Sequence, residues 1–362
     1  MTGPVRRIRV LVVDDSAFAR KVVREVLTAD PEIEVVGIAR DGLDAIEKIA
    51  ELAPDVLTLD LLMPNLDGVG LLRALAGRPS PRVVIVSTAE QDSDLAVEAL
   101  QAGAVEIVHK PTSLATARLY ELSKELVEKV KIAATAYRSG IDAPPSPGLP
   151  AATRALAGSA PGDRPSVPLR VILVGSSTGG PQALTRLLSG LPADLPVPVA
   201  VVQHMPVGYT TALAARLDSI SPLAVVEASE GLVLRPGLVV LGRAGLHMRL
   251  VREGDVERVH LDVAPLESQH RPAVDELFSS AAATYGAAAL AVVLTGMGED
   301  GLKGSRALAA AGAWIFTEAM SSCVVYGMPR AVAEAGLSTR SVALADMAPA
   351  LSALFAADRA SR

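Results

Sequence analysis

The residues with the clearest chemical potential are a serine and the glycines around it. An apolar run at Val171–Val174 predicts a buried strand, and it ends in Gly-Ser-Ser-Thr-Gly-Gly at residues 175–180. Pro181 follows, and proline suits the first turn of a helix. Ser177 is therefore expected on a tight turn between strand and helix. The spacing Gly-x-Ser-x-Gly on such a turn lifts a hydroxyl clear of the sheet for attack on a carbonyl.

The same segment also fits two simpler interpretations. A glycine-rich turn, or a phosphate cradle at a helix N-terminus, has a similar composition. The Gly-x-Gly-x-x-Gly spacing of dinucleotide sites is absent, and so is the lysine of the Walker motif. On this segment alone a nucleophile stays an open hypothesis, and the rest of the chain must decide it.

A nucleophilic serine needs a base, and the base needs an orienting acid. His204 follows an apolar run in VVQHMP, and Asp300 follows another in VVLTGMGEDG. Because the carboxyl ends of parallel strands meet at one edge of a sheet, both residues are expected in one crevice with Ser177. Taken singly, the histidine would more often be structural and the aspartate a cap on the following helix. The glycines around Met297 leave backbone N–H groups available for an oxyanion hole.

The chain order serine, histidine, aspartate is informative in itself. It differs from the order in α/β-hydrolases, chymotrypsin and subtilisin. The Gly-x-Ser-x-Gly match therefore does not predict an α/β-hydrolase fold.

A second set of polar residues marks the strand ends of the first half of the chain. Asp14 and Asp15 end the first expected strand, Asp60 the third and Ser87 the fourth, and Lys110 follows the fifth. Three acids at one edge repel unless a hard cation such as Mg²⁺ binds their oxygens. A lysine and a hydroxyl beside that ion can bind a phosphoryl group, with Asp60 as the nucleophile. Each residue alone would more often be a solvated loop acid or a helix cap.

Short apolar runs alternate with amphipathic helical patterns in both halves. This alternation predicts the α/β class, with two doubly wound parallel sheets. The strands expected in the first half are Arg9–Val13, Val35–Ala39, Val56–Leu59, Val83–Ser87 and Glu106–Val108. Those expected in the second half are Val171–Val174, Val197–Gln203, Ala224–Glu227, Leu238–Leu241, Ala291–Thr295 and Trp314–Thr317, with a hairpin over His247–Leu261.

Seven prolines lie between residues 139 and 168, among glycine, serine and alanine. This composition lacks apolar periodicity and predicts a stiff linker. We therefore expect one domain over residues 1–138, the linker over 139–168 and a second domain over 169–357.

Composition limits the kind of protein. Of 362 residues, 50% are hydrophobic and only 3% aromatic, which fits the aliphatic core of parallel sheets. The net charge of −6 argues against binding to a nucleic-acid backbone. The single cysteine, Cys323, excludes an internal disulfide and indicates a reducing compartment. Asp14 and Asp15 interrupt the first apolar run, which argues against a signal peptide, and no stretch is long enough to insert in a membrane. A cytoplasmic location is expected.

The first half resembles the receiver domain of response regulators over residues 8–130. The resemblance implies that a histidine kinase phosphorylates Asp60 and that Mg²⁺ is the cofactor of that step. It implies that Asp14 and Asp15 bind the metal together with Asp60, and that Ser87 (or Thr88) is the switch hydroxyl. Lys110 then matches the conserved lysine of the family, with a cis peptide before Pro111. One position departs from the family, because Ile107 stands where an aromatic switch residue is usual.

The second half resembles the catalytic domain of the CheB family of chemotaxis methylesterases. The resemblance rests on GSSTGGP, QHMPVGYT, RPAVDELF and LTGMGEDG. It implies that Ser177 is the nucleophile, His204 the general acid–base and Asp300 the orienting acid, with the Met297 N–H in the oxyanion hole. The esterase step then needs no cofactor. Thr178 is a further candidate for positioning the histidine.

The implied function is a phosphorylation-activated serine hydrolase for adaptation in chemotaxis. It would demethylate glutamate methyl esters and deamidate glutamines on methyl-accepting chemoreceptors. Two other interpretations remain open: a hydrolase acting in a non-chemotaxis array, and an adaptor without catalysis.

A second departure, at Glu318–Met320, falls where the family has Gln-Asp-Glu. His247, His270 and Cys323 are expected to be structural or inert.

Overall fold

The computed structural model describes residues 6–77, 80–87, 89–110, 116–136 and 165–359. The chain divides into two compact units, Met1–Ala136 and Tyr137–Arg362. The expected linker over 139–168 lies almost wholly outside the described residues, so its boundaries stay predictions. Within the described ranges, no helix combines the length and apolar character needed to cross a membrane.

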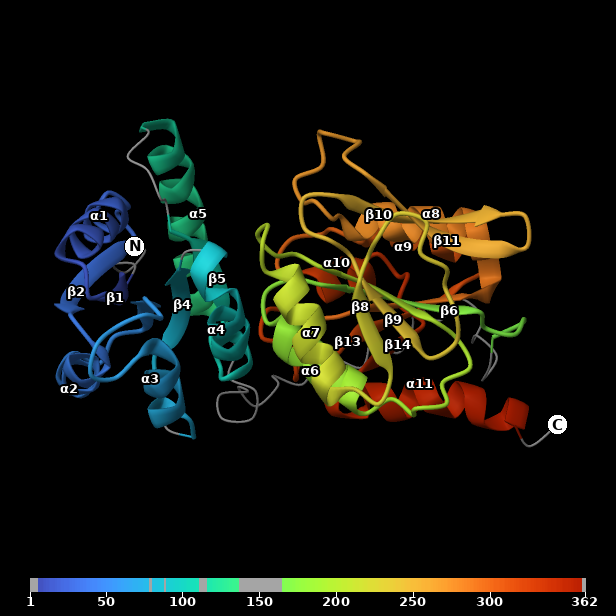
Figure 1. The fold of residues 1–362 in the computed structure, drawn as a ribbon, viewed down its shortest axis with the longest axis horizontal. Helices are drawn as coiled ribbons and strands as arrows, with labels where there is room; N and C mark the ends of the chain where they lie inside the picture. Colours follow the sequence, from blue (N-terminus) through green and yellow to red (C-terminus); the bar gives the residue numbers. More distant parts are fainter. Residues whose placement is uncertain (1–5, 78–79, 88, 111–115, 137–164, 360–362) are drawn as a thin grey trace, which may run out of the picture. The chain divides into compact units, whose positions relative to one another are not determined.

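The first unit is a five-stranded parallel sheet in the order β2-β1-β3-β4-β5 (Figure 1). Its strands are β1 (Ile8–Val13), β2 (Ile33–Ala39), β3 (Val56–Leu59), β4 (Arg82–Ser87) and β5 (Glu106–His109). Its helices are α1 (Ala17–Thr28), α2 (Gly42–Leu52), α3 (Gly68–Leu75), α4 (Ala89–Gln101) and α5 (Thr116–Thr135). The strand order reverses between β1 and β3, and an open α/β sheet binds its ligands beside such a reversal.

Short polar side chains start the first three helices of this unit. The Ser16 hydroxyl accepts from a backbone N–H of α1, and the carboxylates of Asp41 and Asp67 do the same for α2 and α3. These caps satisfy donors that the first turn of a helix leaves unpaired. They also fix where each βα loop ends, and so where the acidic strand ends lie.

The second unit is a seven-stranded parallel sheet in the order β14-β13-β12-β6-β7-β9-β8, with a separate antiparallel hairpin. The strands are β6 (Val171–Ser176), β7 (Val199–Gln203), β8 (Ala224–Glu227), β9 (Leu238–Leu241), β12 (Ala289–Val293), β13 (Trp314–Glu318) and β14 (Arg340–Val342), and the hairpin is β10 (His247–Glu253) with β11 (Val256–Asp262). The helices are α6 (Gly180–Ser189), α7 (Thr210–Ile220), α8 (Val274–Tyr285), α9 (Leu302–Ala310), α10 (Met328–Glu334) and α11 (Leu344–Arg359), with a 3₁₀ turn at Gly286–Ala288.

Helices cover both faces of this sheet, with α8 and the hairpin on one side and α11 on the other (Figure 1). The central strands β6 and β12 are buried along their whole length, as parallel strands covered on two faces must be. One core cluster joins β6, β7 and β12 to α8 through aliphatic side chains and Phe278. The low aromatic content of the chain is thus met by Val, Leu, Ile and Ala packing.

Every expected strand is present, with ends shifted by no more than two residues, and the expected hairpin is formed by β10 and β11. The α/β prediction with two doubly wound parallel sheets is confirmed. The sequence analysis missed β14. This three-residue edge strand has the sequence Arg-Ser-Val and is mostly exposed, so it carries no apolar run to reveal it.

Candidate active site

Ser177 lies at the carboxyl end of β6, on the turn that leads into α6. Its backbone N–H donates to the carbonyl of Thr295 at 3.0 Å, and its carbonyl accepts from the N–H of Gly180 at 2.7 Å. Gly179 has a φ of +78°, in the left-handed region, and a Cβ there would lie 2.6 Å from the Cβ of Val324. Glycine is therefore required for the turn, which leaves Ser177 with 9% of its surface exposed.

His204 lies at the carboxyl end of the neighbouring strand β7. Its backbone N–H donates to the carbonyl of Ser176 at 3.0 Å, which continues the β6–β7 pairing to the sheet edge. Its Nε2 lies 2.7 Å from Oδ2 of Asp300, and its side chain is 7% exposed. Within the part of the chain that the structure describes, Nδ1 of His204 has no hydrogen-bond partner. An ionised carboxylate only accepts, so Nε2 carries a proton, and in the neutral tautomer of the ring the lone pair is on Nδ1.

Asp300 follows β12 and is held by backbone donors as well as by the histidine. Oδ2 also accepts from the N–H of Val274 at 2.7 Å, and Oδ1 accepts from the N–H groups of Asp275 and Gly301, each at 2.9 Å. Burial raises the pKa of Asp300, but the hydrogen bond and charge of His204 and the backbone donors outweigh it. The pKa therefore lies below its ordinary value of 3.8, and the carboxylate stays ionised near neutral pH.

The simpler interpretation of Asp300, a cap on the helix that follows it, is only partly right. The carboxylate accepts mainly from the start of α8, which precedes it by about 25 residues in the chain. Asp275 does the reverse: its Oδ1 accepts from the N–H groups of Gly301 and Gly304, at 2.9 Å and 2.7 Å, where α9 begins. Each of the two aspartates thus accepts from backbone N–H groups at the start of the other's helix. No local pattern in the sequence indicates this role of Asp275, because the pairing depends on tertiary contact.

The loop after β12 packs directly on the serine. A Cβ built on Gly296 would lie 2.8 Å from the Cβ of Ser177, so only glycine permits this approach. Met297 is the next residue of this loop. Thr295 ties the two loops together, since its Oγ1 donates to the carbonyl of Thr178 at 2.9 Å. The sequence analysis named Met297 but missed Thr295.

Glu318 lies behind this loop, at the end of β13. Its side chain is fully buried and accepts from the N–H of Thr295 at 2.8 Å and from the Ser322 hydroxyl at 2.9 Å. Burial raises the pKa of Glu318 above its ordinary value. The departure from Gln-Asp-Glu therefore begins with a residue that supports the backbone next to Met297.

The other histidines and the cysteine differ in their placement. His247 is buried and bonds backbone groups of Ala273 and Pro265, each at 3.2 Å, as expected of a structural residue. His270 was also expected to be structural, but its ring stacks on His204, with centroids 3.9 Å apart. No spacing in the sequence indicates this contact. Cys323 is buried, and burial strongly raises the pKa of its thiol, which fits an inert residue.

The acidic edge of the first unit brings Asp14, Asp15 and Asp60 together. Each offers a carboxylate oxygen within 4.8 Å of the others, which suits a hard cation with oxygen ligands. Lys110 Nζ lies 2.7 Å from Asp14 and 2.9 Å from Asp60. Burial raises the pKa of Asp60, and Lys110 only partly opposes this, while the charge of Asp14 adds to it.

The candidate switch residues of this unit, Ser87 and Lys110, lie at the ends of two neighbouring strands, β4 and β5. Ser87 ends β4 and is buried, and its carbonyl accepts from the Lys110 N–H at 2.7 Å. Ile107 is buried in β5, so no aromatic ring occupies the usual switch position. Thr88 and Pro111, the alternative hydroxyl and the expected cis-proline, lie outside the described residues.

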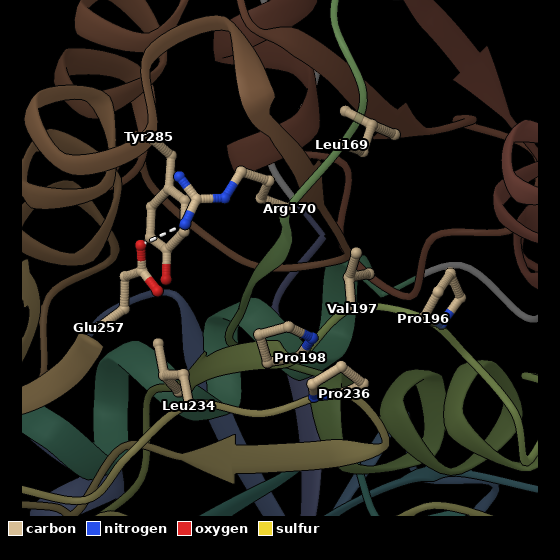
Figure 2. A pocket seen from close by; sticks show the side chains of 9 residues that line it. All are labelled: Leu169, Arg170, Pro196, Val197, Pro198, Leu234, Pro236, Glu257 and Tyr285. Carbon is tan, nitrogen blue, oxygen red and sulfur yellow. Dashed lines mark hydrogen bonds and ion pairs between the residues drawn. The ribbon is translucent and has the colours of Figure 1, made fainter. Parts of the chain in front are cut away.

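A cavity of about 220 Å³ lies at the opposite edge of the second sheet, where β6, β7 and β9 begin (Figure 2). In it, the Arg170 guanidinium pairs with Glu257 and lies over the ring of Tyr285. None of the candidate catalytic residues lines this cavity. It is therefore separate from the chemistry at the carboxyl ends of the strands.

The receiver-type acidic edge and the Ser–His–Asp edge define a class of protein: a response regulator with a hydrolase as its output unit. The family model for the response regulator receiver domain matches residues 10–121, and that for CheB methylesterase matches residues 172–351. A protein-glutamate methylesterase/protein-glutamine glutaminase of Myxococcus xanthus is 59% identical over 95% of this chain and 97% of its own length. The chain belongs to the CheB family.

Two further comparisons agree. A protein-glutamate methylesterase/protein-glutamine glutaminase of Symbiobacterium thermophilum is 46% identical over 96% of each chain. The crystal structure of the catalytic domain of Thermotoga maritima CheB methylesterase is 38% identical, with a TM-score of 0.51. That match covers 52% of this chain and the whole of that domain.

The hydrogen bonds from the start of α9 to Asp275 predict an effect of this residue on the free energy of unfolding. Asp275→Ala removes the carboxylate that accepts from the Gly304 N–H and leaves the Gly301 N–H with Asp300 as its acceptor, and it should lower the free energy of unfolding by about 1 kcal/mol. Asp275→Asn keeps the acceptor oxygen and removes a charge close to Asp300. The measurement is denaturant unfolding followed by the fluorescence of Trp314, the only tryptophan of the chain.

The difference in stability between Asp275→Asn and the wild type should depend on pH, because the pKa of Asp275 is raised in the folded protein. The unfolded chain loses this proton at lower pH than the folded chain, so stability falls as the pH rises through the folded pKa. Asparagine does not titrate. Asp275→Asn should therefore be more stable than the wild type at pH 7, and the gain should shrink as the pH falls through the raised pKa of Asp275 toward the ordinary value of 3.8. A gain that grows on acidification would contradict this account.

Proposed function

We propose that this chain is a protein-glutamate methylesterase and glutaminase whose catalytic triad is Ser177, His204 and Asp300. The observation that carries the proposal is the buried 2.7 Å bond between Nε2 of His204 and Asp300. That bond leaves Nδ1 of the same ring without a partner among the described residues, at the strand end next to Ser177. The substrates are glutamate methyl esters and glutamines of methyl-accepting chemoreceptors, and the enzyme works in the cytoplasm.

In the first half of the reaction, Ser177 Oγ attacks the ester carbonyl and its proton passes to Nδ1 of His204. Asp300 stays ionised and stabilises the imidazolium that forms. The N–H of Met297 donates to the oxyanion of the tetrahedral intermediate. When the intermediate collapses, the proton on Nδ1 goes to the departing methoxide. Methanol leaves, and the glutamyl group stays on Ser177 as an ester.

In the second half, a water molecule gives a proton to Nδ1 and attacks the acyl-enzyme. Collapse breaks the bond to Ser177 Oγ, which takes the proton back, and glutamate is released. A glutamine substrate follows the same route, except that the leaving group is ammonia. His204 must then protonate a nitrogen as it departs, which general acid catalysis provides.

The receiver unit supplies the control. A histidine kinase donates a phosphoryl group to Asp60, and the carboxylates of Asp14, Asp15 and Asp60 fit Mg²⁺. When bound, the ion neutralises charge on the phosphoryl oxygens. Lys110 and the Ser87 hydroxyl bind the remaining oxygens, and phosphorylation raises the esterase rate. An adaptor without catalysis would have no need of the His204–Asp300 pair, and no observation favours an array other than chemotaxis.

Methanol release from methylated receptor membranes tests the triad. Wild-type protein should release methanol, and Ser177→Ala should lose at least about a thousandfold in rate, as removal of a triad nucleophile does in serine hydrolases. Ser189→Ala, at the far end of α6, is the matched control and should keep the wild-type rate. Release by Ser177→Ala at the wild-type rate would refute the proposed nucleophile.

The same assay tests the receiver. A small phosphodonor with Mg²⁺ should raise the wild-type rate and leave the rate of Asp60→Asn unchanged, because asparagine cannot form the acyl phosphate. Equal stimulation of both proteins would exclude Asp60 as the phosphoacceptor.

The proposed cation site predicts a metal dependence that needs no activity assay. Titration calorimetry with MgCl₂ should show binding to the whole chain that weakens at least about tenfold in Asp14→Asn, since a charged ligand is lost. Asp55→Asn, at the other end of β3 from Asp60, is the control and should bind like the wild type. Equal affinity in the wild type and Asp14→Asn would place the ion elsewhere.

A further inference from the structure

Gln203 occupies a position between the two strand ends that carry Ser177 and His204. It is the last residue of β7 and pairs with Ser176, the last residue of β6. Its side chain is 2% exposed, so it cannot reach a substrate in the crevice. The residue precedes His204 directly in the chain, but its side chain points across to the nucleophile turn.

The side-chain amide of Gln203 makes hydrogen bonds through both its nitrogen and its oxygen. Nε2 donates to the carbonyl of Ser177 at 2.9 Å and to the carbonyl of His204 at 2.8 Å. Oε1 accepts from the hydroxyl of Ser176 at 2.7 Å. Because both carbonyls can only accept, the nitrogen must face them, and this settles the orientation of the amide.

The first residue of α6 is shaped to this side chain. A Cβ on Gly180 would lie 1.7 Å from Oε1 of Gln203 and 3.0 Å from Oγ of Ser176. Any larger residue would displace the amide from its place between the loops. Gly180 also donates its N–H to the carbonyl of Ser177, the same oxygen that Gln203 binds.

We propose that Gln203 is a positioning residue that fixes the backbone of Ser177 relative to that of His204. One NH₂ group bridges the carbonyls of the two residues, so neither loop can shift without breaking a buried hydrogen bond. Thr295 holds the turn from the β12 side, but it bonds Ser177 and Thr178 and not the histidine. The Gln203 side chain is thus bonded to both loops.

This inference rests on the proposed roles of Ser177 and His204. Proton transfer from Oγ to Nδ1 requires close alignment, and a displacement of about 1 Å costs about a hundredfold in rate. A buried bridge acts on that alignment and not on the binding of the receptor. Its loss should therefore lower kcat and leave KM nearly unchanged.

The central variant is Gln203→Glu, which keeps the shape of the side chain and replaces the NH₂ group by an oxygen. Two carbonyls then face an acceptor, or at best a single O–H, so the bridge cannot form. We expect kcat for methanol release to fall about thirtyfold to a hundredfold, with KM changed less than about twofold. Labelling of Ser177 by a fluorophosphonate should slow by a similar factor, since it depends on the same activation of the hydroxyl.

Two further variants distinguish a loss of positioning from a general loss of stability. Ser176→Ala removes the bond that orients the amide without touching the two donor contacts, and its kcat should fall by about threefold to tenfold. Thr317→Val is a control in β13 of the same sheet. It removes a buried hydroxyl that hydrogen-bonds the hydroxyl of Ser338 at 2.8 Å. It should keep the wild-type kcat even where its unfolding midpoint drops as far as that of Gln203→Glu.

The outcomes separate this inference from the proposed function. A folded Gln203→Glu protein with wild-type kcat and labelling rate overturns the role of Gln203. If Gln203→Glu does not fold, Ser176→Ala decides, and a wild-type kcat in that variant overturns the role. Wild-type activity in Ser177→Ala would instead refute the proposed triad itself. A fall in kcat in Thr317→Val equal to that in Gln203→Glu would reduce the effect to general stability.

Discussion

The buried bond between His204 and Asp300 is the interaction on which the proposed catalytic edge of the second unit depends. A carboxylate taken out of water is costly unless other groups replace its hydration. Asp300 meets this condition with backbone donors from two helix starts as well as with the imidazole. The same contacts keep its pKa low, so it remains an anion that accepts from Nε2 of the ring, and Nδ1 is the nitrogen that we propose as the base.

This requirement explains much of the surrounding architecture. Two of the backbone donors for Asp300 are available because α8 begins beside β12, and Asp275 on α8 accepts from the start of α9 in return. Gly296 allows the β12 loop to touch the serine, and Gly179 and Gly180 allow the β6 turn to close around it. A few glycines and backbone donors, supplied by strand ends far apart in the chain, therefore build a polar site within an aliphatic core.

The sequence was sufficient for the parts of the structure that repeat. Apolar runs such as Val56–Leu59 and Leu238–Leu241 are strands with the expected bounds, because β-branched and leucine residues bury well on both faces of a parallel sheet. Candidate residues at strand ends could be named because topology brings such ends together. The placement of Asp14, Asp15, Asp60 and Lys110 at one edge follows from the same rule.

The rest of the site depends on contacts that no local pattern encodes. The stacking of His270 on His204 joins a loop to a strand end 66 positions earlier in the numbering, and the Gln203 amide bonds across two loops. Asp275 reads in the sequence as an ordinary acid in the first turn of a helix. Glu318 and Thr295 are polar residues at the ends of apolar runs, and their bond is visible only once β12 and β13 are adjacent.

The most direct test of this account is the protonation state of the His204 ring, measured by ¹⁵N NMR of histidine-labelled protein at pH values where the ring is neutral. The account predicts a proton on Nε2, held by Asp300, and a lone pair on Nδ1, with the preference for that tautomer lost in Asp300→Asn. A wild-type spectrum with the proton on Nδ1 would contradict it, because the nitrogen assigned as the base would then have no lone pair to accept the serine proton.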